Sequence, residues 1–157
     1  MRYGLILIIL TLFVSFTTNV SAQMTQTAPL SLEEAKTILA AAEARANQDN
    51  WTVAIAIVDA GGHLLAFSRI DGTQIGSIEY AIQKAKTSVY FKRPTKAFQN
   101  GLEAGNLALL TLPNSSGHEG GVPIEHNGEV IGAIGVSGVT AQQDGIIGQA
   151  GVDALPR

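Results

Sequence analysis

The sequence predicts an α+β fold, an antiparallel β-sheet flanked by helices, within a chain of 157 residues. Apolar segments of strand length come in neighbouring pairs, and each pair is joined by a turn sequence rich in glycine, which predicts hairpins. Apolar residues also recur at helical spacing before, between and after these pairs. No strand–helix–strand unit carries a nucleotide-binding fingerprint, so we expect hairpins to organise the sheet.

The N-terminal segment has the three-part form of a secretory signal peptide. Arg2 provides the positive charge, a short apolar run follows it, and Val20-Ser21-Ala22 offers a small-residue cleavage site. The run is shorter than the ~20 residues that span a bilayer, and an uncleaved anchor is the alternative. We expect residues 1–22 to be removed, residues 23–30 to form a flexible leader, and residues 31–157 to form one periplasmic or secreted domain.

Composition excludes several kinds of function. The chain has no cysteine, which rules out disulfides, thiolate metal sites, cysteine nucleophiles, covalent haem attachment and a lipid anchor on cysteine. The net charge of −3 gives no basic surface for nucleic acid. We therefore expect neither a nucleic-acid partner nor, after cleavage, a stable membrane anchor.

The first half of the domain reads as a helix followed by a hairpin. Ser31 begins an S-x-x-E capping box, and the helical pattern that follows ends near residues 47–50. Trp51–Val58 is apolar on both faces, which predicts a central strand. The turn Asp59–Gly62 then leads into a second strand, His63–Arg69.

The middle of the chain reads as two helices and a strand. Ser77 is the expected cap of a helix that Pro94 stops. Thr95–Glu103 is a second, short helix, and the apolar run Leu107–Leu112 is a short strand candidate.

A second hairpin and a final helix complete the fold. Val122–His126 and Glu129–Val136 flank Asn127-Gly128, a strong two-residue hairpin signal. Thr140–Leu155 has apolar residues at roughly helical spacing. The prediction therefore contains five strands.

Five blocks of sequence occur in order along this domain. They are residues 58–64 with 69–72, residues 84–87, residues 120–124, residues 130–138, and Asp144 in the final helix. They read VDAGGHL with RIDG, KAKT, GGVPI, and VIGAIGVSG. The ordered set resembles the GlcG/HbpS-like family, also called the haem-degrading domain family, which includes the C-terminal part of PduO-type proteins. The resemblance covers about residues 30–155.

This resemblance implies a profilin-like fold with a five-stranded antiparallel sheet flanked by helices, assembled into dimers or higher homo-oligomers. It implies haem as the cofactor in some members, secreted ones included, and haem degradation or sensing in some. Thr73 stands where many relatives have alanine after the Asp-Gly pair. That departure bears on the chemistry of the local loop.

Two groups of residues are candidates for holding a haem propionate or another small anionic ligand. Arg69 suits paired hydrogen bonds to a carboxylate, with Asp71 beside it; an Arg69–Asp71 ion pair is the alternative. Lys84 and Thr87 share a helix face; the alternative is a solvated Lys84 and a Thr87 that bonds to its own helix. The backbone N–H groups of Gly120-Gly121 can approach an anion closely, or simply form a tight entry to the next strand.

Histidine is the expected iron ligand, since the chain has no thiolate. We expect His118 before His63, because His118 lies in a glycine-rich loop that can close over a pocket. His126, before a hairpin turn, ranks last. On turns, histidine is more often a surface polar group than a ligand.

These observations predict an exported haem-binding protein with a storage, sensing or degradation role. Two alternatives stay open: an enzyme acting on a small oxygenated metabolite through Arg69, Asp71 and Lys84, and a ligand-free structural or regulatory oligomer. A broad apolar pocket with a nearby histidine favours haem. A small pocket lined by Arg69 and Asp71 favours the enzyme.

Overall fold

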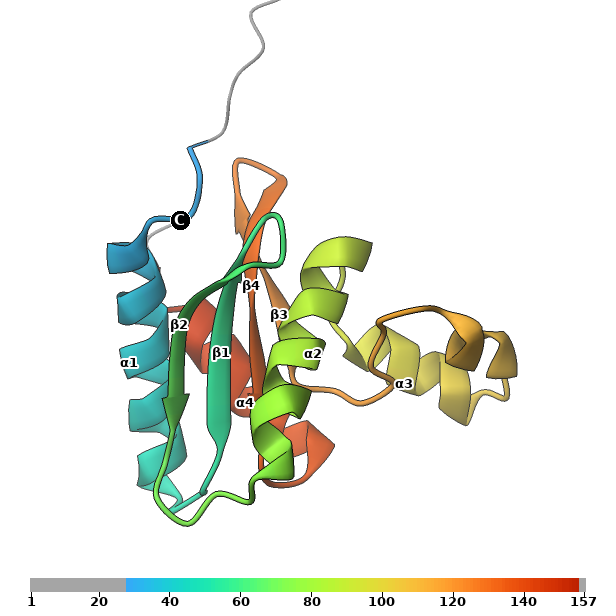
Figure 1. Ribbon diagram of the computed structural model, residues 1–157, viewed down its shortest axis with the longest axis horizontal. Coiled ribbons are helices and arrows are strands. Elements are labelled where there is room, and N and C mark those ends of the chain that lie inside the picture. Colours follow the sequence, from blue (N-terminus) through green and yellow to red (C-terminus); the bar gives the residue numbers. More distant parts are fainter. Residues whose placement is uncertain (1–27, 156–157) are drawn as a thin grey trace, which may run out of the picture.

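The computed structural model describes residues 28–155 and has helices on both faces of one antiparallel sheet (Figure 1). The predicted signal peptide and most of the predicted leader lie outside the described residues. Within residues 28–155, no helix has the length and hydropathy needed to cross a membrane.

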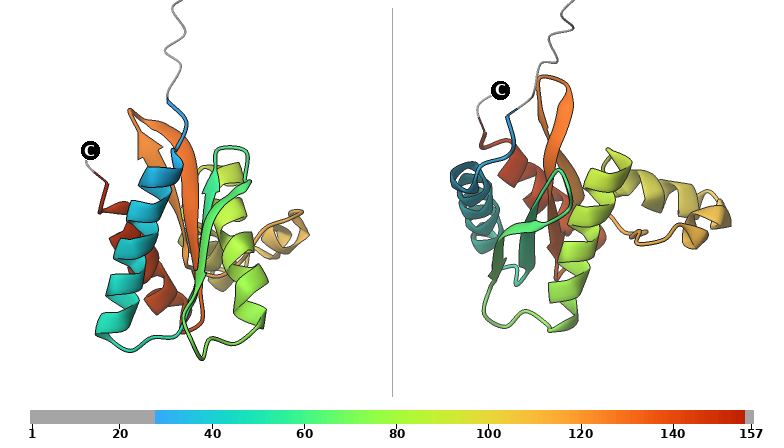
Figure 2. Two further views of the ribbon diagram at one scale, coloured as in Figure 1. Left: turned by 60° about the vertical axis from the view of Figure 1, so that its left-hand side comes forward. Right: turned by 45° about the horizontal axis from the view of Figure 1, so that its top comes forward.

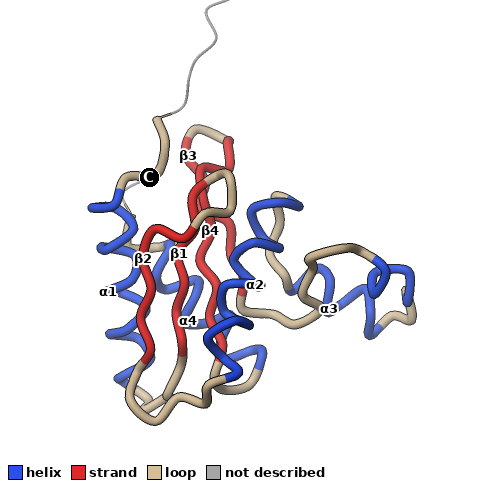
Figure 3. The backbone as a smooth tube through the Cα atoms, in the orientation of Figure 1, coloured by secondary structure: helices blue, strands red, loops and turns tan. Residues whose placement is uncertain are grey.

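The sheet has four strands in the order β2-β1-β4-β3, all antiparallel (Figure 3). Two hairpins build it, as predicted: β1 (Ala54–Asp59) with β2 (Leu64–Arg69), and β3 (Gly121–His126) with β4 (Glu129–Ser137). The Asn-Gly turn of the second hairpin takes positive φ at both residues, 51° and 79°. The apolar strand β1 is central and buried, which confirms its predicted place.

Helices cover the sheet unequally. α1 (Leu32–Gln48) and α4 (Ala141–Val152) pack together on one face, and α2 (Gly76–Phe91) lies on the other (Figure 2). The capping box predicted at Ser31 is present, and Thr140 forms a second one. The main core lies between the sheet and the α1–α4 pair.

The prediction of a strand at Leu107–Leu112, which would have given the sheet five strands, is wrong. Leu107–Thr111 forms a 3-10 helix, η1, which packs on α3 (Lys96–Glu103) in an arm that projects from the sheet (Figure 1). Alternation cannot separate a short apolar strand from a helical turn. At the start of β3, Thr95 exchanges two hydrogen bonds with Gly121 at 2.9 and 3.0 Å.

The predicted cap at Ser77 is also wrong. α2 begins one residue earlier, at Gly76, and its N-terminus has no side-chain cap. Ser77 instead lies buried inside the first turn, and its hydroxyl has no hydrogen-bond partner in the described part of the chain. At Thr73 both the backbone N–H and the hydroxyl donate to the Ile70 carbonyl, at 3.1 and 2.6 Å, so the hydroxyl adds a second hydrogen bond to the local turn.

α2 approaches β4 closely because glycine faces it. A Cβ atom on Gly135 would overlap the carbonyl oxygen of Ala81 and the backbone nitrogen of Ala85. Backbone atoms cannot step aside as a flexible side chain can, so a side chain here would force the helix off the sheet.

We therefore predict that Gly135→Ala lowers the free energy of unfolding by about 2–3 kcal/mol, the range of an overpacked core. Urea denaturation followed by circular dichroism measures it. Gly76→Ala is the matched control, because a Cβ atom there meets nothing within 4 Å. Equal stability of the two variants would contradict the close approach.

Candidate functional site

One face of α2 carries three polar side chains toward the loop that precedes β3. Tyr80, Lys84 and Thr87 are spaced by four and three residues, which places them on one helix face. All three contact residues beyond their own helix. This face brings together several of the predicted site residues.

Lys84 is the most buried charge in this region. Its ammonium lies 2.7 Å from the Asp144 carboxylate, and the two side chains are 2% and 3% exposed. The same ammonium lies 5.2 Å from the centre of the Tyr80 ring, a cation–π contact. Asp144 also accepts a hydrogen bond from the backbone N–H of Val139 at 3.3 Å. The alternative of a solvated Lys84 is wrong, and Lys84 is already paired rather than free for an anionic ligand.

Burial and pairing act in opposite directions on these two groups. Burial lowers the pKa of Lys84 and raises the pKa of Asp144, because a charge is costly to remove from water. The charge of each partner opposes that shift. The pair therefore stays compatible with the interior only while both members are present.

A chain of hydroxyl groups runs from Thr87 outward. The Thr87 hydroxyl donates to the carbonyl of Gln83 at 2.7 Å and accepts the backbone N–H of Ser116 at 2.8 Å. The Ser116 hydroxyl lies 3.1 Å from the Tyr80 hydroxyl, which in turn contacts Nδ1 of His118. Thr87 thus bonds to its own helix, as one alternative held, and also anchors the loop. Its one hydroxyl proton is therefore already engaged.

Gly120 and Gly121 lie buried between this face and the strands. A Cβ atom on Gly121 would overlap the Lys84 carbonyl, and Gly120 has a φ of 130°. Both glycines let the loop pack against α2. This geometry corresponds to the tight strand entry rather than to an open anion cradle.

Arg69, Asp71 and His63 lie elsewhere. Arg69 and Asp71 are exposed near the end of β2, and no ion pair joins them in the described part of the chain. His63 is 82% exposed at the β1–β2 turn, where its Nδ1 lies 3.2 Å from the Asp59 carboxylate. The structure therefore separates these three residues from Lys84, Thr87 and His118.

A large groove opens at the other end of β3, and the histidine ranked last lies on it. Its volume is about 810 Å³, and it runs between the β3–β4 hairpin, the start of α1 and the end of α4. The apolar residues that line it are Val122, Pro123, Ile124, Ile131, Val152 and Leu155. The polar residues that line it include His126 and three carboxylates, Glu33, Glu34 and Glu125.

The carboxylates give this groove an acidic rim. The Ser31 side chain and backbone donate hydrogen bonds to Glu34 and lower its pKa, with the charge of His126 a smaller contribution in the same direction. A small anionic ligand is therefore repelled here. An amphipathic ligand fits if its apolar body enters the groove and its charges face solvent.

Sequence reasoning missed three contributors to these sites. Asp144 interrupts the apolar face of its helix, and an acidic residue there signals a buried cation as its partner. Tyr80 lies one helical turn before Lys84, so helix geometry alone places it nearby. The groove gave no signal, because it forms between segments that are far apart in sequence.

The chain is similar to several known proteins. Residues 30–153 match the family model described as "Haem degrading protein HbpS-like". Protein GlcG of Escherichia coli (strain K12) is 41% identical over 108 residues, which cover 69% of this chain and 81% of GlcG.

Two solved structures share the fold. The crystal structure of HbpS superposes with a TM-score of 0.78 at 32% identity, covering 86% of this chain and 96% of that one. The PduOC:heme complex superposes with a TM-score of 0.74 at 28% identity, covering 82% and 96%.

We predict that Asp144→Asn destabilises the protein by about 3–5 kcal/mol at neutral pH, because it leaves the Lys84 ammonium buried without a counter-charge. The substitution also lowers the pKa of Lys84 further, since it removes the Asp144 charge, the largest contribution that now raises it, and leaves only the smaller contribution of Glu119. Above this lowered pKa the folded state holds a neutral Lys84, whereas the unfolded state keeps its proton up to about the ordinary value of 10.5. Stability of the variant should therefore rise with pH across that window.

Denaturant titrations of both proteins from pH 7 upward measure this effect. The double variant Lys84→Met with Asp144→Asn is the control, because it removes the buried ammonium; it should regain part of the stability and lose the excess pH dependence. A pH profile of Asp144→Asn parallel to that of the parent protein would contradict this account.

Proposed function

Because the chain belongs to the HbpS-like family, we propose that it binds haem, with the macrocycle in the groove beside β3 and His126 as the iron ligand. One observation carries the proposal: a groove of about 810 Å³ with an apolar floor and a histidine on its rim. Sites for ligands of this size have volumes of roughly 300–1,000 Å³. The PduOC relative forms a complex with haem, which supports the choice of ligand.

The residues present suit the group. The half-buried Val152 and Leu155 offer apolar surface to a planar macrocycle, and the buried core residues Val122, Ile124 and Ile131 also line the groove. Imidazole is a common axial ligand of haem iron. The groove lining contains three carboxylates and no lysine or arginine, so the propionates would have to face solvent, away from Glu33, Glu34 and Glu125. Haem, when bound, supplies an iron centre for electron exchange or for binding a small gas.

His118 is the competing ligand. Its Nδ1 contacts Tyr80, and a hydroxyl both donates and accepts, so Nδ1 can keep its proton and leave Nε2 for a metal. The cavity near His118, however, measures only about 70 Å³, which is too small for a porphyrin within one chain. Room for the macrocycle therefore favours His126.

No observation favours the enzyme alternative through Arg69 and Asp71, since neither of the two cavities described contains them. The homo-oligomer stays a prediction. The exposed arm residues Leu107 and Leu110, 66% and 68% accessible, support it.

We predict that haemin added to the purified mature protein gives a saturable Soret band. His126→Ala should weaken binding about tenfold or more and change the band, because it removes the imidazole that would bind the iron. His118→Ala and His63→Ala are matched controls that should keep the parent spectrum. Absence of saturation would overturn haem binding itself. If haemin binding is lost in His118→Ala and kept in His126→Ala, the iron ligand is His118, in the loop before β3, and the proposed place in the groove is wrong.

We also propose that the protein is exported to the periplasm or secreted, on the strength of the signal-peptide pattern in residues 1–22. Intact mass spectrometry of the protein recovered outside the cytoplasm should give a chain that begins at Gln23. Recovery of the uncleaved chain in the membrane fraction would contradict this and favour the anchor.

A further inference from the structure

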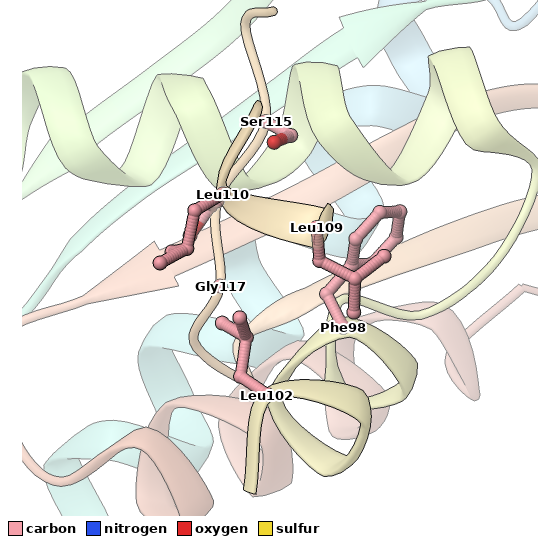
Figure 4. Close-up of a pocket in the computed structure, with 7 residues that line it drawn as sticks. Phe98, Leu102, Leu109, Leu110, Ser115 and Gly117 are labelled. Carbon is pink, nitrogen blue, oxygen red and sulfur yellow. The ribbon is translucent and has the colours of Figure 1, made fainter. Parts of the chain in front are cut away.

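A second cavity lies within the projecting arm and shares no lining residue with the groove. Its volume is about 70 Å³. Phe98 and Leu102 of α3 and Leu109 of η1 surround it, and the segment with Ser115 and Gly117 runs past them (Figure 4). An apolar cavity of ~150 Å³ holds benzene, so this one has room for about two to four heavy atoms.

Glycines shape this cavity by seating its leucines. A Cβ atom on Gly101 would lie 2.5 Å from Leu109 Cδ1, and one on Gly117 would lie 2.5 Å from Leu102 Cδ1. Each leucine tip therefore rests on bare backbone.

One wall of the cavity is polar. Ser116 is 2% exposed and lines it, and Ser115 lines it too. The Ser115 hydroxyl donates to the Leu112 carbonyl at 3.0 Å, and the Ser116 hydroxyl donates to Tyr80 at 3.1 Å. With both protons engaged, these oxygens can only accept further hydrogen bonds; the Ser116 oxygen already accepts the His118 backbone N–H at 3.4 Å and has one acceptor position left. A ligand that is complementary to these two oxygens carries a hydrogen-bond donor.

The Ser116 hydroxyl also connects the cavity to the surface. Tyr80 joins it to His118, whose ring edge meets the Tyr80 ring at a centroid distance of 5.8 Å. His118 is exposed. A change in hydrogen bonding at Ser116 therefore passes through one tyrosine to an imidazole that contacts solvent.

We propose that this cavity binds a short-chain alcohol of about two to four heavy atoms. Its carbon chain lies against Phe98, Leu102 and Leu109, and its hydroxyl donates to Ser116. The Ser116–Tyr80–His118 chain links the bound hydroxyl to solvent. The inference is independent of haem binding, because it uses no residue of the groove.

The test uses 1-propanol as the polar probe and xenon as the apolar probe, each titrated into the mature protein with labelled methyl groups. Both should shift the Leu102 and Leu109 signals saturably. Ser116→Ala should weaken 1-propanol about tenfold, the value of one hydrogen bond, and leave xenon unchanged. In Tyr80→Phe, 1-propanol should no longer shift the His118 ring signals.

Leu102→Phe should abolish binding of both probes by filling the cavity. Leu64→Phe, the same change at an exposed position on β2, is the control that should bind both. Saturable shifts with neither probe, or equal 1-propanol binding in Ser116→Ala and the parent, would overturn the proposal. A failed haemin titration would leave it standing.

Discussion

The buried pair of Lys84 and Asp144 is the interaction on which the rest of the structure depends. It joins α2 on one face of the sheet to the first turn of α4 on the other, at the end where β4 finishes and β3 begins. Burying two charges recovers little net stability, but losing one of them is costly. The pair therefore acts mainly as a constraint: it fixes which two helices meet, and where.

That constraint positions the loop before β3. A Cβ atom on Gly120 would lie 2.8 Å from the Lys84 ammonium and 2.9 Å from Asp144 Cβ, so the loop packs directly on the pair. Thr87 and Thr95 then hold the loop at Ser116 and Gly121. Two surfaces result on either side: the cavity under the arm, and the groove beyond β3.

Local sequence signals predicted the elements better than their assembly. The capping box at Ser31 and the turn Asn127-Gly128 depend on a few adjacent residues, and both are confirmed. Leu107–Leu112 was assigned wrongly because a short apolar run suits a strand or a helical turn equally well, and the packing against α3 that decides between them is not visible in the local sequence.

In the candidate site, too, local signals predicted single residues better than their assembly. Helix spacing placed Lys84 and Thr87 on one face. No local pattern indicated that Lys84 is buried against Asp144, a residue 60 positions away. His126 ranked last because a histidine beside a turn is usually solvated. Its place on the groove becomes visible only once three segments that are separate in sequence have assembled.

The central claim is that haem occupies this groove. Haemin is paramagnetic and broadens the NMR signals of nearby methyl groups, so methyl-labelled protein titrated with haemin reports its location. The account predicts that Val122, Ile124 and Ile131 broaden first while Leu102 and Leu109 stay sharp. Broadening of Leu102 and Leu109 with the groove methyls unchanged would contradict it.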